Sequence, residues 1–169
     1  MAAKGYDSHR PLLIETGRVF GHRIKRIMEL GSGFYSSSVF LDRTHFPNVE
    51  SFISYETERK WYKTVSEVLS GAIEEGRLDY RLYNKFEEVD VSLTGDLLFV
   101  DGVKRHRKQI LARMHNNFDL IICHDTDLWW FTDKERSYFK YLWGYKPRGR
   151  HTGIMSNFID VESVNWFTK

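Results

Sequence analysis

Acidic residues stand at or beside the ends of several apolar segments that are expected to form strands. Five such segments end in short polar stretches, and four of the five carry an acid at or next to the end. These ends read Glu29-Leu30-Gly31-Ser32-Gly33, Tyr55-Glu56, Tyr83-Asn84, Val100-Asp101-Gly102 and Cys123-His124-Asp125. Carboxylates accept hydrogen bonds, take up protons and hold cations, so this repeated arrangement is the strongest functional signal in the sequence.

Asp101, His124 and Asp125 are the candidate catalytic residues, because they end the fourth and fifth expected strands. Two chemistries fit them. In the first, Asp101 or His124 is a general base for a hydroxyl, amine or imidazole. In the second, Asp101 and Asp125 hold a divalent cation that lowers the pKa of a substrate hydroxyl, and their hard oxygen ligands suit Mg²⁺. Structural roles also stay open: Asp125 can cap the following helix or turn, and His124 can be a non-catalytic histidine.

Gly31 and Gly33 form a tight turn directly after the first expected strand. A Walker loop needs Lys-Ser/Thr after its last glycine, and Phe34-Tyr35 stands there instead. A dinucleotide-binding turn needs a third small residue, which Ser36 supplies, but Glu29 before the turn would repel a pyrophosphate. A carboxylate there suits a cationic or hydroxyl-bearing ligand such as S-adenosylmethionine, which has an ammonium, a sulfonium and a ribose diol. Plain packing of a helix against a strand is the other explanation of the glycines.

Glu56 ends the second expected strand, about 25 residues after Gly31, close to the spacing of the ribose-binding acid in nucleotide-binding folds. Its carboxylate can accept hydrogen bonds from both ribose hydroxyls. Together with the glycine turn, this acid predicts a nucleoside ligand.

Strand and helix signals alternate along the chain. The expected strands are Arg26–Leu30, Ser51–Glu56, Leu78–Tyr83, Asp96–Val100, Phe118–Cys123, Tyr138–Tyr145 and Gly153–Ile159. The expected helices are Arg10–Phe20, Arg59–Leu69 and Lys104–Asn116, with a helical or irregular return over Ser36–Arg43. Gly71 is expected to end the second helix, and Lys146–Arg150 to join the last two strands as a turn.

This order predicts an α/β fold, a doubly wound, mostly parallel sheet with a C-terminal antiparallel hairpin. The length of 169 residues predicts one domain, in which residues 1–22 are an N-terminal helical segment that leads into the core. In such sheets ligands bind outside the carboxyl ends of the strands.

The sequence resembles the Rossmann-like (class I) S-adenosylmethionine-dependent methyltransferases over nearly its whole length, through Glu29-Leu30-Gly31-Ser32-Gly33 and Glu56 in this strand order. Three further stretches resemble a small subgroup of these enzymes: Asp7-Ser8-His9-Arg10-Pro11-Leu12-Leu13, His124-Asp125-Thr126-Asp127 and Met155-Ser156-Asn157-Phe158. The resemblance implies a seven-stranded sheet and a set of cofactor-binding residues. These are Glu29, Gly31, Ser32 and Gly33 around the methionine moiety, Glu56 at the ribose, Tyr83 and Asn84 near the adenine, and Asp101.

The two acids at the fourth and fifth strand ends are also similar to those of metal-dependent O-methyltransferases of the catechol and macrocin types. The catechol type continues Asp-Asn, whereas this chain has Asp125-Thr126, so a third protein ligand is missing from the pattern. The (Asp/Asn)-Pro-Pro-aromatic motif of amino-methyltransferases is replaced by Asp101-Gly102-Val103-Lys104, and no prolyl-cysteine nucleophile is present. These absences disfavour methylation of DNA bases and leave RNA and protein acceptors open.

Several other features bear on partners and location. The net charge of +2 gives no argument for nucleic acid, and the basic run Lys104–Lys108 is expected to be a solvated helix face. Leu128-Trp129-Trp130-Phe131 either walls an acceptor pocket or belongs to the core, where at least one tryptophan is expected. The lone Cys123, the absence of a signal peptide and the lack of a membrane-spanning stretch predict a cytoplasmic protein without a membrane partner.

The sequence therefore predicts a methyltransferase that uses S-adenosylmethionine, with or without Mg²⁺, to methylate an O or N atom of an unidentified acceptor. The acceptor is a small molecule or an exposed site on a macromolecule. A non-catalytic Rossmann-like domain that binds a ligand or partner is the alternative. A nicotinamide-dependent enzyme is disfavoured by Glu29 and by the missing third glycine.

Overall fold

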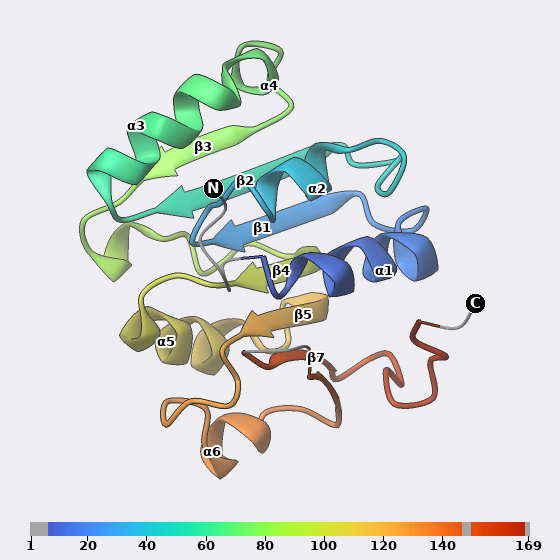
Figure 1. Ribbon diagram of the computed structural model, residues 1–169. Coiled ribbons are helices and arrows are strands. Elements are labelled where there is room, and N and C mark those ends of the chain that lie inside the picture. The colour runs from blue at the N-terminus through green and yellow to red at the C-terminus, as the bar shows by residue number, and fades with distance from the viewer. Residues whose placement is uncertain (1–6, 147–149, 168–169) are drawn as a thin grey trace.

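Seven strands form a single sheet in the order β3-β2-β1-β4-β5-β7-β6 in the computed structural model, which describes residues 7–146 and 150–167 (Figure 1). The strands are β1 (Arg26–Leu30), β2 (Ser51–Glu56), β3 (Asp79–Leu82), β4 (Gly95–Val100), β5 (Phe118–His124), β6 (Tyr141–Tyr145) and β7 (Thr152–Ser156). Strands β1 to β5 pair in parallel, and β7 runs antiparallel to both β5 and β6. The predicted Rossmann-like, mostly parallel seven-stranded sheet with a C-terminal antiparallel hairpin is confirmed.

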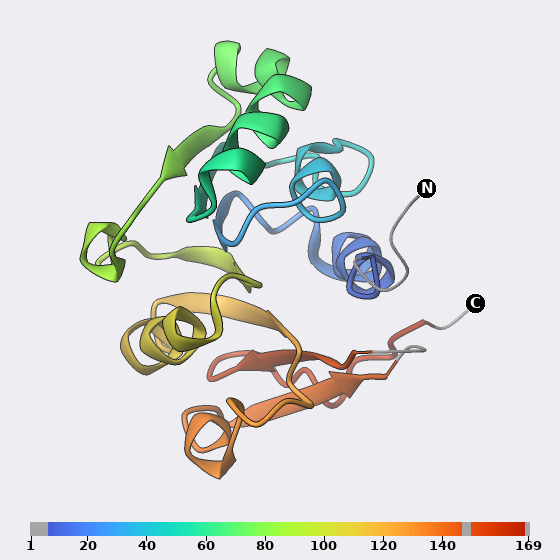
Figure 2. The same ribbon diagram turned by 60° about the vertical axis from the view of Figure 1, so that its left-hand side comes forward.

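Helices cover both faces of the sheet. They are α1 (Arg10–Phe20), α2 (Ser37–Leu41), α3 (Arg59–Val68), α4 (Ser70–Glu74), α5 (Lys104–Met114) and α6 (Asp133–Arg136), with a short 3₁₀ helix, η1 (Phe86–Glu88). Figure 2 shows α1 and α2 on one side of the sheet and α5 on the other. Because both faces are covered, the central strand β4 is a continuous apolar run, with Leu97–Val100 fully buried.

The sheet separates two hydrophobic cores. On the side of α1 to α4, Leu13, Phe40 and Val65 pack against strand residues that include Phe99. On the opposite side, residues of α5 and the segment after β5 pack against the alternate strand positions; they include Ile110, Met114, Trp130 and Leu98. Every second residue of a strand therefore faces α1, and this alternation decides which polar side chains meet at the strand ends.

Most of the expected elements occur, and three of them, Arg10–Phe20, Arg26–Leu30 and Ser51–Glu56, have the predicted bounds. The role of Gly71 was predicted wrongly. The helix that was expected to stop there ends at Val68, and Gly71 lies inside the following α4. Gly76, with φ of 69°, is the residue that leaves the helical region, because glycine adopts a positive φ without a steric penalty.

The C-terminal hairpin is shorter than expected, and α6 was not predicted. Strand β6 begins at Tyr141 and not at Tyr138, whose ring stacks on that of His115 at 5.1 Å between centroids. Residues 147–149 of the expected turn, and the first six residues of the expected N-terminal segment, lie outside the described residues. Within the described parts of the chain, no helix has the length and hydropathy needed to cross a lipid bilayer.

Candidate functional site

Asp101 and His124 lie on the α1 face of the sheet, at the carboxyl ends of β4 and β5. Phe99 of β4 and Ile122 of β5 point into the core beneath α1. Asp101 and His124 each follow two residues later, so the alternation of the strand places them on the same face. Val100 pairs with Cys123 across the two strands, which brings the two ends side by side.

The first position of the glycine turn after β1 must be glycine because the end of the neighbouring strand β4 lies too close for a side chain. Gly31 has φ of 91°, and a Cβ added to it would lie 2.3 Å from the backbone nitrogen of Gly102. Gly33 has no such neighbour, since the nearest atom to an added Cβ is the Ser36 hydroxyl oxygen at 3.6 Å. Close packing of β1 against β4 therefore requires Gly31, while Gly33 leaves the turn open on its other side.

Glu29 lies beneath this turn and is fully buried. Its Oε2 accepts hydrogen bonds from the hydroxyls of Ser37, at 2.7 Å, and Ser54, at 2.5 Å, whereas Oε1 has no hydrogen-bond partner among the described residues. Burial raises the pKa of Glu29 to about 7, against the lowering effect of the serine hydroxyls. Through these two hydrogen bonds the Glu29 carboxyl group connects α2 to β2 beneath the turn.

Glu56 lies at the end of β2 and faces the glycine turn. Its Oε1 accepts the backbone N–H groups of Thr57 and Glu58, at 2.7 and 2.8 Å, and its Oε2 accepts the hydroxyl of Ser32 at 3.1 Å. The Ser32 hydroxyl also lies 2.5 Å from the hydroxyl of Tyr80. The carboxylate is thus held in a fixed orientation and already binds a hydroxyl group.

Tyr83 and Asn84 follow β3 but point in different directions. The Tyr83 side chain is buried in the core on the α5 side, where its hydroxyl lies 3.0 Å from Nδ1 of His106. Asn84 is exposed next to it, and its backbone N–H donates to Glu88. Of the two residues expected near an adenine, only Asn84 has a side chain free to meet a ligand.

Arg107 of α5 joins the two acids at the ends of β4 and β5. Its Nη2 lies 3.0 Å from Oδ1 of Asp101, and its Nη1 lies 3.2 Å from Oδ2 of Asp125. The guanidinium also donates to the backbone carbonyls of Gly102 and His124, at 2.6 and 2.8 Å, and the side chain is only 6% exposed. Such a buried, multiply hydrogen-bonded arginine fixes both strand ends relative to α5.

The predicted magnesium pair of Asp101 and Asp125 does not fit this arrangement. The guanidinium of Arg107 stands between the two carboxylates and compensates their charge, which is the role expected of the ion. In addition, Asp125 adopts φ of 58°, and its carbonyl accepts the N–H groups of Leu128 and of the Trp130 indole. Asp125 therefore starts the turn after β5, in line with the structural role that the sequence left open.

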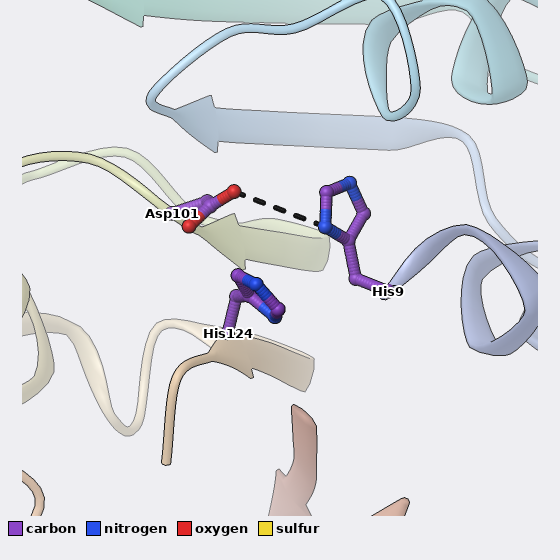
Figure 3. A group of neighbouring side chains, drawn as sticks. All are labelled: His9, Asp101 and His124. Atoms are coloured by element: carbon purple, nitrogen blue, oxygen red, sulfur yellow. Dashed lines mark ion pairs between the residues drawn. The ribbon is translucent and has the colours of Figure 1, made fainter. Parts of the chain in front are cut away.

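His9 meets Asp101 and His124 from the N-terminus of α1 (Figure 3). Its Nδ1 lies 3.9 Å from Oδ2 of Asp101, and its ring centroid lies 4.9 Å from that of His124. His9 is 4% exposed, and among residues 7–146 and 150–167 neither of its ring nitrogens has a hydrogen-bond partner. In His124, Nδ1 lies 3.0 Å from the hydroxyl of Thr152, and Nε2 makes two longer contacts of 3.5 Å, with the hydroxyl of Ser8 and with Oδ1 of Asp125.

The charges of this group are shifted by burial. Burial, helped by the charge of the nearby Arg107, lowers the pKa of His9 to about 3 and that of His124 to about 4, so both imidazoles are neutral at neutral pH. Loss of water contact raises the pKa of Asp101 despite the opposing effect of Arg107. Burial likewise raises the pKa of the Cys123 thiol, which disfavours the reactive thiolate form.

Sequence reasoning missed Arg107 and His9. Arg107 was read as part of a solvated basic face, but it is buried, and it shares the inward face of α5 with Ile110, Leu111 and Met114. That spacing of three, four and seven residues is the helical period and was a usable signal. For His9 the local sequence offers no comparable signal, because its partners lie about 90 or more residues away in the chain and are met only through the fold.

The aromatic run after β5 divides between core and surface. Trp130 is fully buried and Phe131 is nearly so, which confirms that at least one tryptophan belongs to the core. Trp129 is 74% exposed, with Nζ of Lys108 at 5.9 Å from its ring centroid. It is therefore available at the surface beside the end of β5.

No protein family and no curated protein matches the sequence, but many solved structures have the same fold. One is a candidate O-methyltransferase from Klebsiella pneumoniae, with a TM-score of 0.69 and 16% identity over 94% of this chain and 84% of that one. Another is TrmK from M. capricolum, solved with the cofactor product S-adenosyl-homocysteine, with a TM-score of 0.59 and 13% identity over 86% and 67% of the two chains. A spermidine synthase from Thermotoga maritima has a TM-score of 0.66 and 15% identity over 95% and 63%.

These likenesses show that the chain has the Rossmann-like fold of class I methyltransferases, as the sequence resemblance implied. The spermidine synthase shares this fold, so the fold by itself does not decide which group is transferred. That decision depends on the residues at the strand ends.

Proposed function

We propose that this protein is an S-adenosylmethionine-dependent methyltransferase that methylates an O or N atom of its acceptor. The observation that carries the proposal is Glu56, which lies at the end of β2, faces the glycine turn and already accepts a hydroxyl hydrogen bond there. The fold supports the proposal, because solved proteins that share it include one with S-adenosyl-homocysteine bound.

The cofactor would bind across the ends of β1, β2 and β3. Gly33 and Ser32 would line the methionine moiety, and Glu56 would accept the ribose hydroxyls in place of the Ser32 hydroxyl. Asn84 stands at the end of β3, on the adenine side of this arrangement. Glu29 would support the turn from below instead of touching the ligand, because its side chain is fully buried.

Methyl transfer is an in-line displacement at the methyl carbon. The acceptor's lone pair forms the new bond, the carbon–sulfur bond breaks, and its electron pair stays on sulfur, which becomes a neutral thioether. An acceptor that carries a proton loses it in the process. The enzyme supplies mainly position, and a group that takes up the proton. Asp101 and His124 stand where the acceptor would approach, and Arg107 fixes the Asp101 carboxylate.

Binding of the donor tests the proposal against its alternatives. Calorimetric titration with S-adenosylmethionine and S-adenosyl-homocysteine should give saturable 1:1 binding, and titration with NAD⁺ should give none. A donor with a labelled methyl group then separates an enzyme from a non-catalytic binding domain, through transfer to small-molecule or macromolecular acceptors. If neither the donor nor its demethylated product binds, the proposal is wrong.

Substitution of Glu56 tests the site. We expect Glu56→Ala to weaken binding of S-adenosylmethionine by roughly 10- to 100-fold, because two charge-assisted hydrogen bonds to the ribose are lost, at about 1 kcal/mol or more each. Glu67→Ala removes an exposed glutamate of α3 and serves as the matched control. Equal affinities of the two variants in calorimetry would exclude Glu56 as the ribose ligand.

A further inference from the structure

His9, Asp101 and His124 surround a common space on the α1 face of the sheet (Figure 3). One potential ligand atom from each residue can be chosen so that all three lie within 4.8 Å of one another. We propose that these three residues bind a divalent transition-metal ion of the zinc class. Nothing in the sequence predicted this site, because His9 belongs to a stretch far from the two strand ends.

The unpartnered nitrogens of His9 are the first argument. Its ring is buried against Phe99 and His124, and both nitrogens lack a hydrogen-bond partner within the part of the chain that the structure describes. Leaving a buried polar atom without a partner costs about 1–3 kcal/mol. A histidine with two such atoms therefore destabilises the fold if it serves only to fill space. A metal ion would satisfy one nitrogen through its lone pair, and the neutral ring has that lone pair available.

The distances are the second argument. The gap of 3.9 Å between Nδ1 of His9 and Oδ2 of Asp101 is too long for a hydrogen bond. Two ligand atoms about 2.1 Å from one tetrahedral ion lie roughly 3.4 Å apart, so a small inward movement of the side chains would close the site.

The orientation of the other two ligands is the third argument. Nδ1 of His124 lies 3.0 Å from the Thr152 hydroxyl, so Nε2 is the nitrogen that can coordinate, since its contacts with Ser8 and Asp125 are both long at 3.5 Å. Oδ1 of Asp101 accepts from Arg107 at 3.0 Å, which leaves Oδ2 facing His9. Metal-binding histidines and carboxylates are commonly held by such outer hydrogen bonds, which set the tautomer and the direction of the lone pair.

The donor set also selects the kind of ion. Two imidazole nitrogens and one carboxylate oxygen suit zinc and its first-row neighbours, whereas Mg²⁺ prefers oxygen ligands and an octahedral shell. The nearby Arg107 and Arg150 offset the negative charges of Asp101 and Asp125, which weakens affinity for any cation and favours ions that bond strongly to imidazole. Asp101 is 24% exposed, so the ion can enter from its side.

Three protein ligands leave a fourth position open on a tetrahedral ion. This extension rests on the proposed function: the site lies at the ends of β4 and β5, where the acceptor would approach. An acceptor hydroxyl in the open position would have its pKa lowered by the ion and lose its proton to solvent. The ion would then lower the pKa of the acceptor hydroxyl, which is the role that the sequence analysis gave to Mg²⁺. His9 and His124 would bind it together with Asp101, in place of Asp125.

Zinc titration of the chelator-treated full chain tests the site. Calorimetry should show one Zn²⁺ per chain, and a large excess of Mg²⁺ should not displace it. Co²⁺ should bind in its place and give visible absorption bands of four-coordinate intensity. We expect His9→Ala and His124→Ala each to weaken Zn²⁺ binding roughly 100-fold or more, and Thr152→Val to weaken it by about 10- to 100-fold through loss of the outer hydrogen bond.

The matched control is His22→Ala, which removes an exposed histidine from the turn after α1 and should leave Zn²⁺ affinity unchanged. Asp101→Asn keeps the size of the side chain and an oxygen for Arg107, so it tests the ligand even if the histidine variants fold poorly. The site is refuted if Zn²⁺ does not saturate at one per chain, or if Asp101→Asn and His9→Ala bind it as tightly as His22→Ala. Titration of the same proteins with S-adenosylmethionine keeps the two proposals apart, because donor binding without zinc binding refutes the metal site alone.

Discussion

Arg107 is the residue that fixes the ends of both β4 and β5. Its guanidinium holds the carboxylates of Asp101 and Asp125 and the backbone carbonyls at both strand ends. Its charge is the reason why two acids can stand side by side with little access to water. The sequence suggested that a bound metal cation compensates Asp101 and Asp125, whereas the guanidinium of Arg107 compensates them in the structure.

We therefore expect Arg107→Ala to destabilise the protein by about 3 kcal/mol or more, because it leaves two poorly solvated carboxylates facing each other without compensation. Urea unfolding at neutral pH measures the loss. Arg59→Ala, which removes an exposed arginine at the start of α3, should change stability by less than about 0.5 kcal/mol. A loss of similar size in both variants would contradict the bridging role.

At the scale of elements, the turn between β1 and α2 depends on one glycine. The β1 and β4 ends approach each other so closely that no side chain fits at Gly31, and its φ of 91° disfavours any L-residue. The sequence indicated that something approaches these glycines, but it could not indicate that for Gly31 the neighbour is the backbone of the next strand.

Gly31→Ala should accordingly destabilise the protein by more than about 2 kcal/mol, through strain and displacement of the β4 end. Gly71→Ala is the matched comparison. That glycine lies within α4 and has nothing within 4 Å of an added Cβ, so alanine should be neutral or stabilise by up to about 1 kcal/mol. Denaturant unfolding of both variants measures the difference, and the opposite order of stabilities would overturn this account of the turn.

The elements were largely predictable because the buried parallel strands are continuous apolar runs and the longer helices are amphipathic. The short helices were less predictable from the sequence. The start of α6 carries a capping box, in which Thr132 and Glu135 bond each other's backbone N–H groups, and its T-x-x-E pattern was legible in the sequence. The break between α3 and α4 falls at Leu69, which makes no side-chain cap hydrogen bond, so the sequence carries no capping pattern there.

At the scale of the whole molecule, the strand ends collect acids on a buried face, and the folded state must accommodate their charge. The sequence predicted which acids would meet at this edge, since strand order and alternation follow from the pattern. The sequence could not predict which residues contact these acids, because Arg107 and His9 belong to α5 and to the start of α1, and the complete fold sets how these helices pack. Glu29 shows the energetic consequence most clearly, since it is buried with one oxygen unpartnered.

The contribution of Glu29 to stability should consequently fall as the pH rises from about 4.5 to about 7. In this range the unfolded chain has released the Glu29 proton, while the folded protein, in which burial raises the pKa of Glu29 to about 7, retains it. The loss amounts to roughly 3 kcal/mol and is complete above pH 7.

Glu29→Gln removes this dependence, so urea unfolding should show its advantage over the parent protein growing by roughly 3 kcal/mol between pH 5 and pH 8. Glu67→Gln, at an exposed position, should show no such growth. An advantage of Glu29→Gln that is the same at both pH values would mean that Glu29 is ionised throughout.

The contact between Ser32 and Glu56 has a kinetic consequence. Glu56 is fully engaged before any nucleoside arrives, with two backbone N–H groups on one oxygen and the Ser32 hydroxyl on the other. An entering ribose replaces the single Ser32 hydroxyl with its own two hydroxyls, so it can occupy the carboxylate only after Ser32 has left. The rate of association should therefore level off at high ligand concentration, at the rate with which Ser32 leaves.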